Sequence, residues 1–411
     1  MSETLTDTST AAQAPEYPMP RPSACPFAPP EQAKALNRSA PLNRVRIWDG
    51  STPWLVTGYH EYKTLMSDAR VSVNDHLPGF PDWNEGMRAI KDARPKSVFT
   101  TDGEEHSRYR RMLTKPFTFK RVAALRPGIQ AITDEHIDRM LEGPRPADLV
   151  AALALPIPTL MISDMLGVPY EDHEFFQKHA TLNVDRFATR EQAAAGRSTL
   201  ARYLIDLLKR KLDEPAEDLA TDLAERVRSG EIDMREAAQL GTGVLIAGHE
   251  TSANMIGLGT LALLRNPGQW ALLRDSDDPK LVAGAVEELL RYLGIIQNGQ
   301  RRIATADIRV GDITVRAGEG LIFDLSAANW DEREWRGPDE LDITRPAAHH
   351  LGFGFGPHQC VGQQLARAEL QIVFETLVRR IPTLRLAIPF DEVEFKHDRL
   401  AYGVYALPVA W

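Results

Sequence analysis

The sequence has 411 residues, and its 48 Lys plus Arg against 57 Asp plus Glu give a formal net charge of −9. A composition of 43% hydrophobic and 26% charged residues is typical of a globular protein with a large core, which excludes a disordered chain and a coiled-coil rod. The acidic balance argues against a general nucleic-acid-binding protein. Only two cysteines occur, so no disulfide framework carries the fold, and we expect a cytoplasmic protein.

The N-terminus combines acidic and hydroxyl residues without the basic-then-apolar order of a signal peptide. We expect residues 1–22 to form a flexible leader and residues 23–411 to form one domain. No segment reaches the ~20 apolar residues that a membrane span requires, so the sequence predicts no membrane anchor.

Periodicity predicts the elements in chain order. A strand at 54–57 precedes a helix at 58–67, and a loop at 77–96 rich in Pro and Gly is long enough to be functional. Apolar residues at helical spacing then predict helices at 106–116, 122–141, 159–166, 197–212, 234–264 and 282–293. The period changes to two at 308–310, 313–315 and 321–323, which predicts short strands. A helix at 363–380 and a strand at 407–409 complete a mainly α domain with a minor β part.

A glycine-rich loop, FGFGPHQCVG at residues 353–362, stands directly before the last helix. Glycine lets the backbone approach a flat partner closely. A helix N-terminus stabilises an anion, so we expect the pKa of the Cys360 thiol to lie below its usual value of about 8.5. Such a thiolate can be a nucleophile or a metal ligand, and a buried thiol in a tight turn is the alternative.

The segment AGHETS, residues 247–252, lies inside the long predicted helix. Gly248 is unfavourable there by roughly 0.5–1 kcal/mol against Ala, and Thr251 can bond back to a carbonyl and bend the helix. Together with Glu250, these residues indicate a groove lined by a proton-delivery pair. A packing glycine beside an incidental acid is the alternative.

With these motifs the sequence resembles the cytochrome P-450 family over nearly its whole length. The loop at 353–362 fits the haem-ligand signature F-x-x-G-x-x-x-C-x-G, and Glu288 with Arg291 fits the family's E-x-x-R pair. The leader sequence CPF at residues 25–27 and the ending LPVAW are similar to those of soluble actinobacterial members. The resemblance implies the cytochrome P-450 fold.

The resemblance also implies roles for single residues. Cys360 would be the axial thiolate of haem b, a ligand that favours O–O cleavage. Thr251 would hold dioxygen and its water, Glu250 would feed protons inward, and His249 has no implied role. Glu288 and Arg291 would serve folding and haem retention, with Trp330 standing where relatives commonly have Arg. The other residues implied to bind the haem or its propionates are His106, Arg110, Ala247, Gly248, Arg302, Phe353 and His358.

The implied function is a haem-thiolate monooxygenase that inserts one atom of O2 into a mid-sized or large, mostly apolar secondary metabolite or xenobiotic. A monomer with electrons from ferredoxin and ferredoxin reductase is expected, because the chain has no flavin or iron–sulfur motif of its own. One alternative is a haem-binding sensor or carrier, which would have no use for the Glu250–Thr251 pair. Another is a hydrolytic metal site built from His349, His350 and His358, although no H-E-x-x-H pattern occurs.

The resemblance further places a substrate pocket and a docking surface. Expected pocket residues are the 77–98 loop, 183–187, Val244, Ala247, Ile295, Ile296, Leu400 and Ala401, with Arg88, Arg186 and Asn298 as polar anchors. A basic surface for an acidic ferredoxin would draw on Arg108, Arg111, Lys115, Lys120, Arg121, Arg126, Arg367, Arg379 and Arg380. Arg110 would be committed to a propionate, so the expected exposed candidates are Arg108, Arg111, Lys115 and Arg367. A solvated charged face is the alternative.

Overall fold

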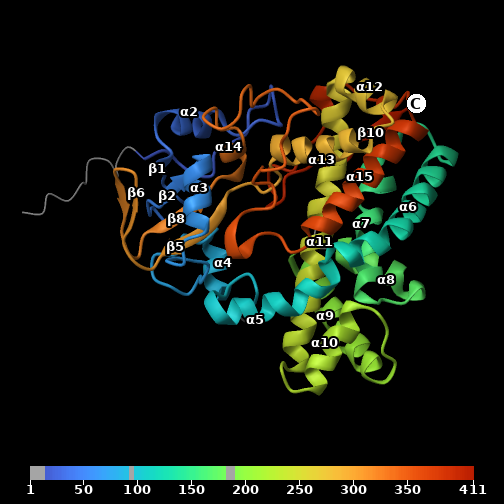
Figure 1. The fold of residues 1–411 in the computed structure, drawn as a ribbon, viewed down its shortest axis with the longest axis horizontal. Helices are drawn as coiled ribbons and strands as arrows, with labels where there is room; N and C mark the ends of the chain where they lie inside the picture. Colours follow the sequence, from blue (N-terminus) through green and yellow to red (C-terminus); the bar gives the residue numbers. More distant parts are fainter. Residues whose placement is uncertain (1–13, 92–96, 182–189) are drawn as a thin grey trace, which may run out of the picture.

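A large helical part and a smaller β-rich part lie side by side in the computed structural model (Figure 1), which describes residues 14–91, 97–181 and 190–411. The mainly α fold with a minor β part is therefore confirmed. The helical part holds α5 (Gly103–Thr114), α6 (Phe119–Glu142), α7 (Pro156–Leu166), α8 (His173–Thr181), α9 (Arg190–Asp213), α10 (Leu219–Arg228), α11 (Met234–Arg265), α12 (Pro267–Asp275), α13 (Pro279–Leu293) and α15 (Gln363–Arg380). Around the β-rich part lie α2 (Glu31–Ser39), α3 (Tyr59–Met66), α4 (Glu85–Ile90) and α14 (Leu325–Asn329).

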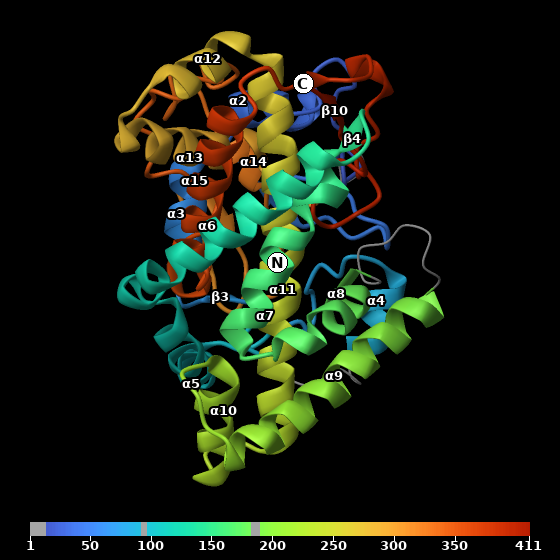
Figure 2. The same ribbon diagram turned by 90° about the vertical axis from the view of Figure 1, so that its right-hand side faces the viewer.

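Helix α11 runs through the middle of the helical part, as Figure 2 shows. Its start is set by a capping box in which the side chain of Asp233 accepts from the backbone of Glu236 and the Glu236 carboxylate accepts from the Asp233 N–H. The helix is 32 residues long, buries most of its second half, and packs along its length against α7, α9, α13 and α15. It therefore forms the centre of the core and borders the site described below.

The largest sheet has five strands in the order β1 (Leu42–Arg44), β2 (Trp54–Val56), β8 (Gly320–Phe323), β5 (Gln300–Ala304) and β3 (Val71–Ser72). Strands β2 and β8 are parallel, and the other pairs are antiparallel. A second sheet is ordered β4 (Ala147–Asp148), β10 (Pro408–Ala410) and β9 (Arg385–Leu386), and β6 (Ile308–Val310) pairs with β7 (Ile313–Val315). Single turns at η2 (Lys115–Phe117), η3 (Val150–Ala154), η4 (Tyr170–Asp172), η5 (Gly356–His358) and η6 (Phe390–Glu392) join these elements.

The predicted loop at 77–96 is wrong in part, because it contains α4. The side chain of Asn84 accepts a hydrogen bond from the N–H of Met87 at 2.9 Å, which starts this helix. Helix α7 likewise begins at Pro156, earlier than predicted, because a proline at the first helical position loses no hydrogen bond.

The predicted flexible leader is wrong for residues 14–22, while residues 1–13 lie outside the described part of the chain. Tyr17 is buried, and its N–H donates to the carbonyl of Arg46 at 2.8 Å. The buried guanidinium of Arg21 donates to the carbonyl of Gly294 at 2.6 Å and to Ser326 Oγ at 3.1 Å. These bonds hold the leader on the domain.

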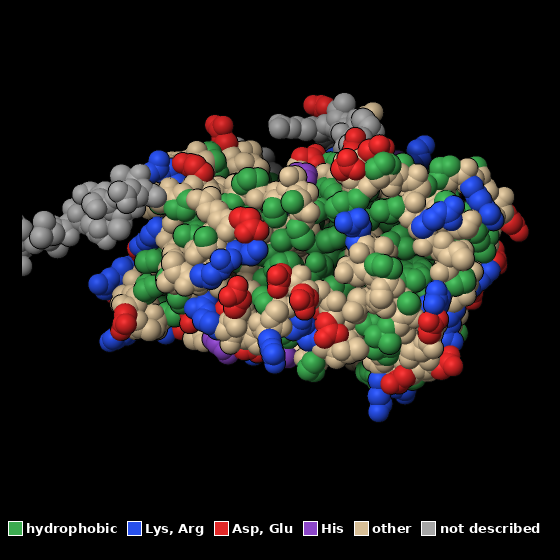
Figure 3. All heavy atoms as spheres, turned by 90° about the horizontal axis from the view of Figure 1, so that it is seen from above, with side chains coloured by type: hydrophobic (Ala, Val, Ile, Leu, Met, Phe, Trp, Pro, Cys, Tyr) green, Lys and Arg blue, Asp and Glu red, His purple; other side chains and the backbone are tan. Residues whose placement is uncertain are grey.

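None of the described helices combines the length and the apolar character that crossing a membrane requires. On the face drawn in Figure 3, hydrophobic side chains gather near the middle, and Lys and Arg are interspersed with Asp and Glu. That face therefore carries no patch of a single charge sign.

Candidate active site

A cavity of about 950 Å³ lies where α5, α11, α13, β5 and the loop before α15 meet. The structure brings all but one of the predicted site residues to its wall: His106, Arg110, Ala247, Gly248, Thr251, Arg302, Phe353, His358 and Cys360. The exception, Glu250, is half-buried on α11 beside Thr251 and does not line the cavity.

The loop that carries Cys360 is held by its own backbone. The N–H of Cys360 donates to the carbonyl of Phe353 at 2.8 Å, which closes the loop three residues before α15 begins. Gly356 has φ +74°, and a Cβ there would lie 2.1 Å from the carbonyl oxygen of Met66. Only glycine fits this turn, which brings the loop against α3.

Both cysteines are free, and Cys360 is the one at the cavity, while Cys25 packs against the hydrophobic core. The expectation of a lowered thiol pKa is wrong for the protein alone. Burial raises the pKa of Cys360, and this outweighs the hydrogen bond from the Gly362 N–H and the charges of Arg110 and Arg367. An electropositive ligand to the sulfur would be needed to favour the thiolate.

Four basic side chains gather at one end of the cavity: His106, Arg110, Arg302 and His358. The His106 and His358 rings lie 4.0 Å apart between centroids, and Nε2 of His106 is buried without a partner. Among the described residues, no carboxylate forms an ion pair with Arg110 or Arg302. Burial and the charges of His358, Arg110 and Arg302 lower the pKa of His106 to about 4.

These residues fit a haem. Arg110 and Arg302 are partly buried cations without a carboxylate partner, which is costly, and two propionate groups would supply such partners. The cysteine sulfur in the same cavity is a suitable axial ligand for iron. His358 lies 3.6 Å from Asp102, which would orient its ring.

Helix α11 presents its glycine and hydroxyl segment to the same cavity. The Thr251 hydroxyl donates to the carbonyl of Ala247 at 2.7 Å, as the sequence predicts for a local bend. Burial raises the pKa of Glu250, and the charges of Lys396 and Arg399 oppose the rise. His249 is buried and lies outside the cavity wall, in line with its lack of an implied role.

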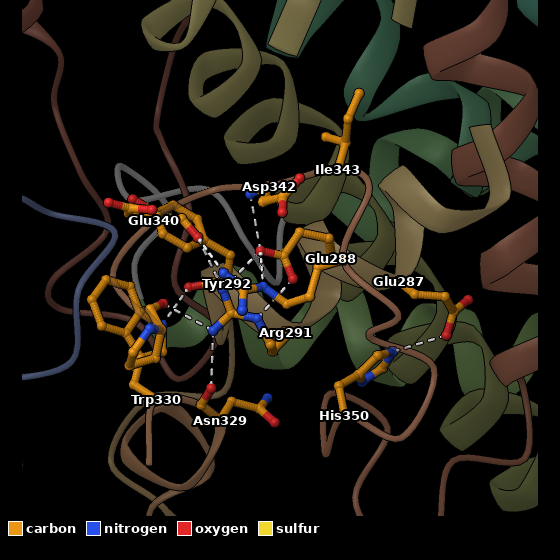
Figure 4. A network of polar contacts seen from close by, with 12 residues as sticks. Glu287, Glu288, Arg291, Tyr292, Asn329, Trp330, Glu340, Asp342, Ile343 and His350 are labelled. Atoms are coloured by element: carbon orange, nitrogen blue, oxygen red, sulfur yellow. Dashed lines mark hydrogen bonds and ion pairs between the residues drawn. The ribbon is translucent and has the colours of Figure 1, made fainter. Parts of the chain in front are cut away.

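A buried ion pair clamps α13, which forms one wall of the cavity (Figure 4). Arg291 donates to both carboxylate oxygens of Glu288 at 2.7 and 2.8 Å, and both side chains are fully buried. Its remaining N–H groups donate to the carbonyls of Asn329, Pro338 and Glu340. The pair therefore fastens α13 to the segment that precedes the Cys360 loop.

Trp330 stands where relatives commonly have arginine, and it makes contacts that an arginine would not make. Its ring stacks on Tyr292 at 5.1 Å, and its indole N–H donates to the Tyr292 carbonyl at 3.0 Å (Figure 4). Arg345 supplies a further cation to Glu288, at 3.1 Å. The clamp is thus complete without a charge at position 330.

The predicted pocket residues are only partly correct. Val244, Ile295, Ile296 and Leu400 line the cavity, as does part of the 77–98 loop, whereas Ala401 does not. Arg88 and Asn298 do not reach it either. Arg88 is bound to Asp82 at 2.9 Å and stacks on Trp48, and Asn298 forms the turn before β5 with φ 64°. Residues 183–187, including Arg186, lie outside the described residues.

Sequence reasoning missed several charged residues of the cavity wall, among them Asp75, Glu236, Arg301 and Glu369. Arg301 is buried, donates to the carbonyls of Pro81 and Asp82, and stacks on Trp83, so it ties the 77–98 loop to β5. Alternation along a strand places neighbouring arginines on opposite faces, but the sequence does not show which of these faces is covered.

Another of these residues is Glu369 on α15, which is buried, lines the cavity and accepts a hydrogen bond from Ser252. Burial raises its pKa to about 7. An acid flanked at helical spacing by apolar residues signals such an interior position.

The three histidines of the hydrolytic alternative do not meet. His349 stacks on Trp335 at 4.2 Å, His350 contacts Glu287 at 3.1 Å, and His358 lies in the cavity beside His106. Within the described ranges, no group of three or more His, Cys, Asp or Glu side chains could hold a metal ion. The arrangement does not support a hydrolytic metal site.

Many of the basic residues expected at the docking surface are ion-paired. Lys115 pairs with Asp222, and Arg367 pairs with Glu287 at 2.7 Å. Further pairs are Arg108 with Glu236, Arg121 with Glu217, Arg379 with Glu375 and Arg380 with Asp134. Arg111 and Lys120 are exposed and have no ion pair among the residues that the structure describes.

Comparison with known proteins agrees with this geometry. The family model "Cytochrome P-450" matches residues 192–383. The chain is 63% identical to cytochrome P-450 CYP105Q4 of Mycobacterium marinum, over 100% of both chains. It is 45% identical to pentalenic acid synthase of Streptomyces avermitilis, over 99% of this chain and 100% of that protein. The crystal structure of GfsF, a cytochrome of Streptomyces halstedii, superposes on this chain with a TM-score of 0.93. The two sequences are 52% identical, and the match covers 97% of this chain and 100% of the GfsF chain.

Proposed function

The chain belongs to the cytochrome P-450 family and is a haem-thiolate monooxygenase, and from this premise we propose that it hydroxylates a mid-sized or large, mostly apolar secondary metabolite. In this proposal Cys360 binds the iron of haem b, and His106, Arg110, Arg302 and His358 hold the propionates. The observation that carries it is the meeting in one cavity of one free thiol, four basic groups, of which Arg110 and Arg302 form no ion pair among the described residues, and the Thr251 segment of α11.

When bound, the haem would use dioxygen and two external electrons to place one oxygen atom in the substrate and release the other as water. The protein must deliver two protons for that water and keep bulk solvent away. Thr251 has its hydroxyl at the cavity wall, where it can accept and pass on a proton. Glu250, directly beside it and half-buried, keeps its proton to a higher pH than an exposed carboxyl does, because burial raises its pKa, and it can therefore serve as the proton donor.

Thr251→Ala tests this proton delivery. We expect product formation to fall by roughly 10²-fold, the lower end of what a positioned proton donor contributes, while electrons are diverted to peroxide or water. Haem content and substrate affinity should stay unchanged, and Thr251→Ser, which keeps the hydroxyl, should retain most of the activity. The measurement is product formed per reducing equivalent. Equal coupling in Thr251→Ala and the parent would favour a haem sensor or carrier instead.

The cavity wall supports an apolar substrate. Phe99, Ile246 and Leu400 line it and are 58%, 41% and 54% exposed. Covering such side chains with an apolar ligand is favourable by about 25 cal/mol per Å². The relative pentalenic acid synthase, by its name, makes pentalenic acid. A compound screen for displacement of water from the ferric iron, followed by product analysis with redox partners, tests the proposed substrate class.

We also propose a monomeric, cytoplasmic enzyme that takes its electrons from an acidic ferredoxin and its reductase. Arg111 and Lys120 are exposed at α5 and α6, and Phe119 between them is 78% exposed. This surface is near the proposed ligand, because a Cβ on Gly362 would lie 3.5 Å from the Phe117 ring. A partner docked there would have a short path to the iron.

Arg111→Ala/Lys120→Ala should slow reduction by such a ferredoxin by about tenfold at low salt, because local basic charge steers association. The dependence of the rate on ionic strength should flatten, and substrate affinity should stay the same. Stopped-flow reduction over a salt series measures both effects. Arg309→Ala, which removes an exposed charge on the β6–β7 hairpin, is the matched control. An unaltered slope in the double variant would place the docking site elsewhere.

A further inference from the structure

The C-terminal segment 395–404 covers the outer face of α11 behind the cavity. Phe395 pairs with Val404 in an isolated bridge, and the N–H of Lys396 donates to the carbonyl of Gly403 at 2.8 Å. The segment meets α11 at Asn254, since a Cβ on Gly403 would lie 2.1 Å from the Asn254 side-chain oxygen. Asn254 is one helical turn after Glu250, so both side chains share this face.

Lys396 brings a buried positive charge to that face. Its side chain belongs to a residue only 4% exposed, and Nζ donates to Asn254 Oδ1 at 2.8 Å. An ammonium group has three N–H donors, so a neutral amide satisfies it only in part. Within the described residues, no carboxylate lies close enough to form an ion pair with it, and Glu250 is the acid that interacts with it most strongly.

Few other charges face Glu250. Arg399, on the same segment as Lys396, is the only other charge that acts on Glu250 among the residues that the structure describes. Arg399 is itself close to Asp398, at 3.6 Å, and donates to the Tyr405 hydroxyl at 3.4 Å. On α11, burial and the Lys396 charge lower the pKa of His249 to about 4, so this imidazole is neutral at pH 7 and adds no charge.

We infer that Lys396 is a positioning residue for oxygenation: its buried ammonium group, held by Asn254 one helical turn from Glu250, acts on Glu250 through its charge and controls how readily this acid releases a proton toward Thr251. This inference rests on the proposed function of Glu250. Beyond that function, the inference assigns the control of proton release from Glu250 to the C-terminal segment packed on α11. Opposite charge stabilises the carboxylate form of Glu250, so Lys396 keeps this acid able to lose its proton despite its burial.

The test uses the full-length, haem-loaded enzyme and Lys396→Met. Infrared difference spectroscopy follows the protonated carboxyl band of Glu250, which is assigned by its loss in Glu250→Gln. We expect the pKa of Glu250 to rise by about one unit in Lys396→Met, because the attraction of an opposite charge is lost. Lys396→Arg, which keeps the charge, should restore the parent titration. The alkaline limb of the pH profile of coupling should move to higher pH by the same amount, since the protonated acid is the proton donor.

A second variant guards against a merely structural defect. Lys396→Met/Asn254→Leu removes both partners of the Lys396–Asn254 hydrogen bond, which is usually less disruptive than removing one, although the Ala401 carbonyl loses the donor that Asn254 supplies at 3.3 Å. An unchanged Glu250 titration in either folded variant would overturn the inference. A shifted titration with normal coupling in Thr251→Ala would instead support the role of Lys396 and contradict the proposed proton delivery, so the two failures are distinguishable.

Discussion

Cys360→Ser is expected to abolish oxygenation and to remove the thiolate signature of the haem. A neutral alcohol is a poor, hard donor to iron and cannot push electron density onto it as a thiolate does. The parent enzyme, reduced and treated with carbon monoxide, should show the strongly red-shifted Soret band of thiolate-ligated haem. The variant should lose this band even where it retains haem.

Cys25→Ser is the matched control for this prediction. Cys25 packs against the core and does not line the cavity, so its replacement should leave the carbonyl spectrum unchanged. A parent protein with a histidine-type spectrum, or a Cys25→Ser variant that loses the red-shifted band, would contradict the assignment of Cys360.

Arg291→Ala is expected to cause the largest loss of stability. Its guanidinium is fully buried and bound to Glu288 and three backbone carbonyls, so truncation leaves a buried carboxylate and several acceptors unpaired. Breaking a buried pair in this way costs about 3–5 kcal/mol. We expect denaturant unfolding at a lower midpoint and loss of haem, because α13 forms a wall of the cavity.

Arg345→Ala is the comparison for this effect. Arg345 contacts the same carboxylate at 3.1 Å but lies at the edge of the clamp, with its side chain 12% exposed. Its loss should cost clearly less stability than the loss of Arg291. Equal destabilisation by the two variants, or haem retention and normal stability in Arg291→Ala, would show that the clamp does not hold the site together.

The long elements could be predicted because their apolar residues repeat at a constant spacing. Helices α11 and α15 begin where expected, and α15 also ends there. Strand β5 was missed, because two adjacent arginines interrupt its short apolar pattern, and only the sheet shows that Arg301 is buried. The leader was misjudged for a similar reason, since its order depends on acceptors such as the Gly294 carbonyl far along the chain.

In the site, too, residues in local motifs could be predicted, and contacts between distant segments could not. The motifs placed Cys360, Thr251 and the propionate candidates, because each lies in a short segment with a distinctive pattern. The pairing of Lys115 with Asp222 and the approach of Lys396 to α11 depend on residues more than a hundred positions apart. No local pattern contains that information, and the same holds for the carboxyl–hydroxyl contact of Glu369 with Ser252.

The central claim, that this chain places one atom of dioxygen in an organic substrate, is tested most directly by isotope labelling. A compound that displaces water from the ferric iron is turned over with ferredoxin, reductase and labelled dioxygen, and the product is analysed by mass spectrometry. We predict one labelled oxygen atom in each product molecule, with the second appearing in water. Two results would contradict a monooxygenase: product oxygen that derives from solvent water, or electron consumption that yields only peroxide with every compound that binds.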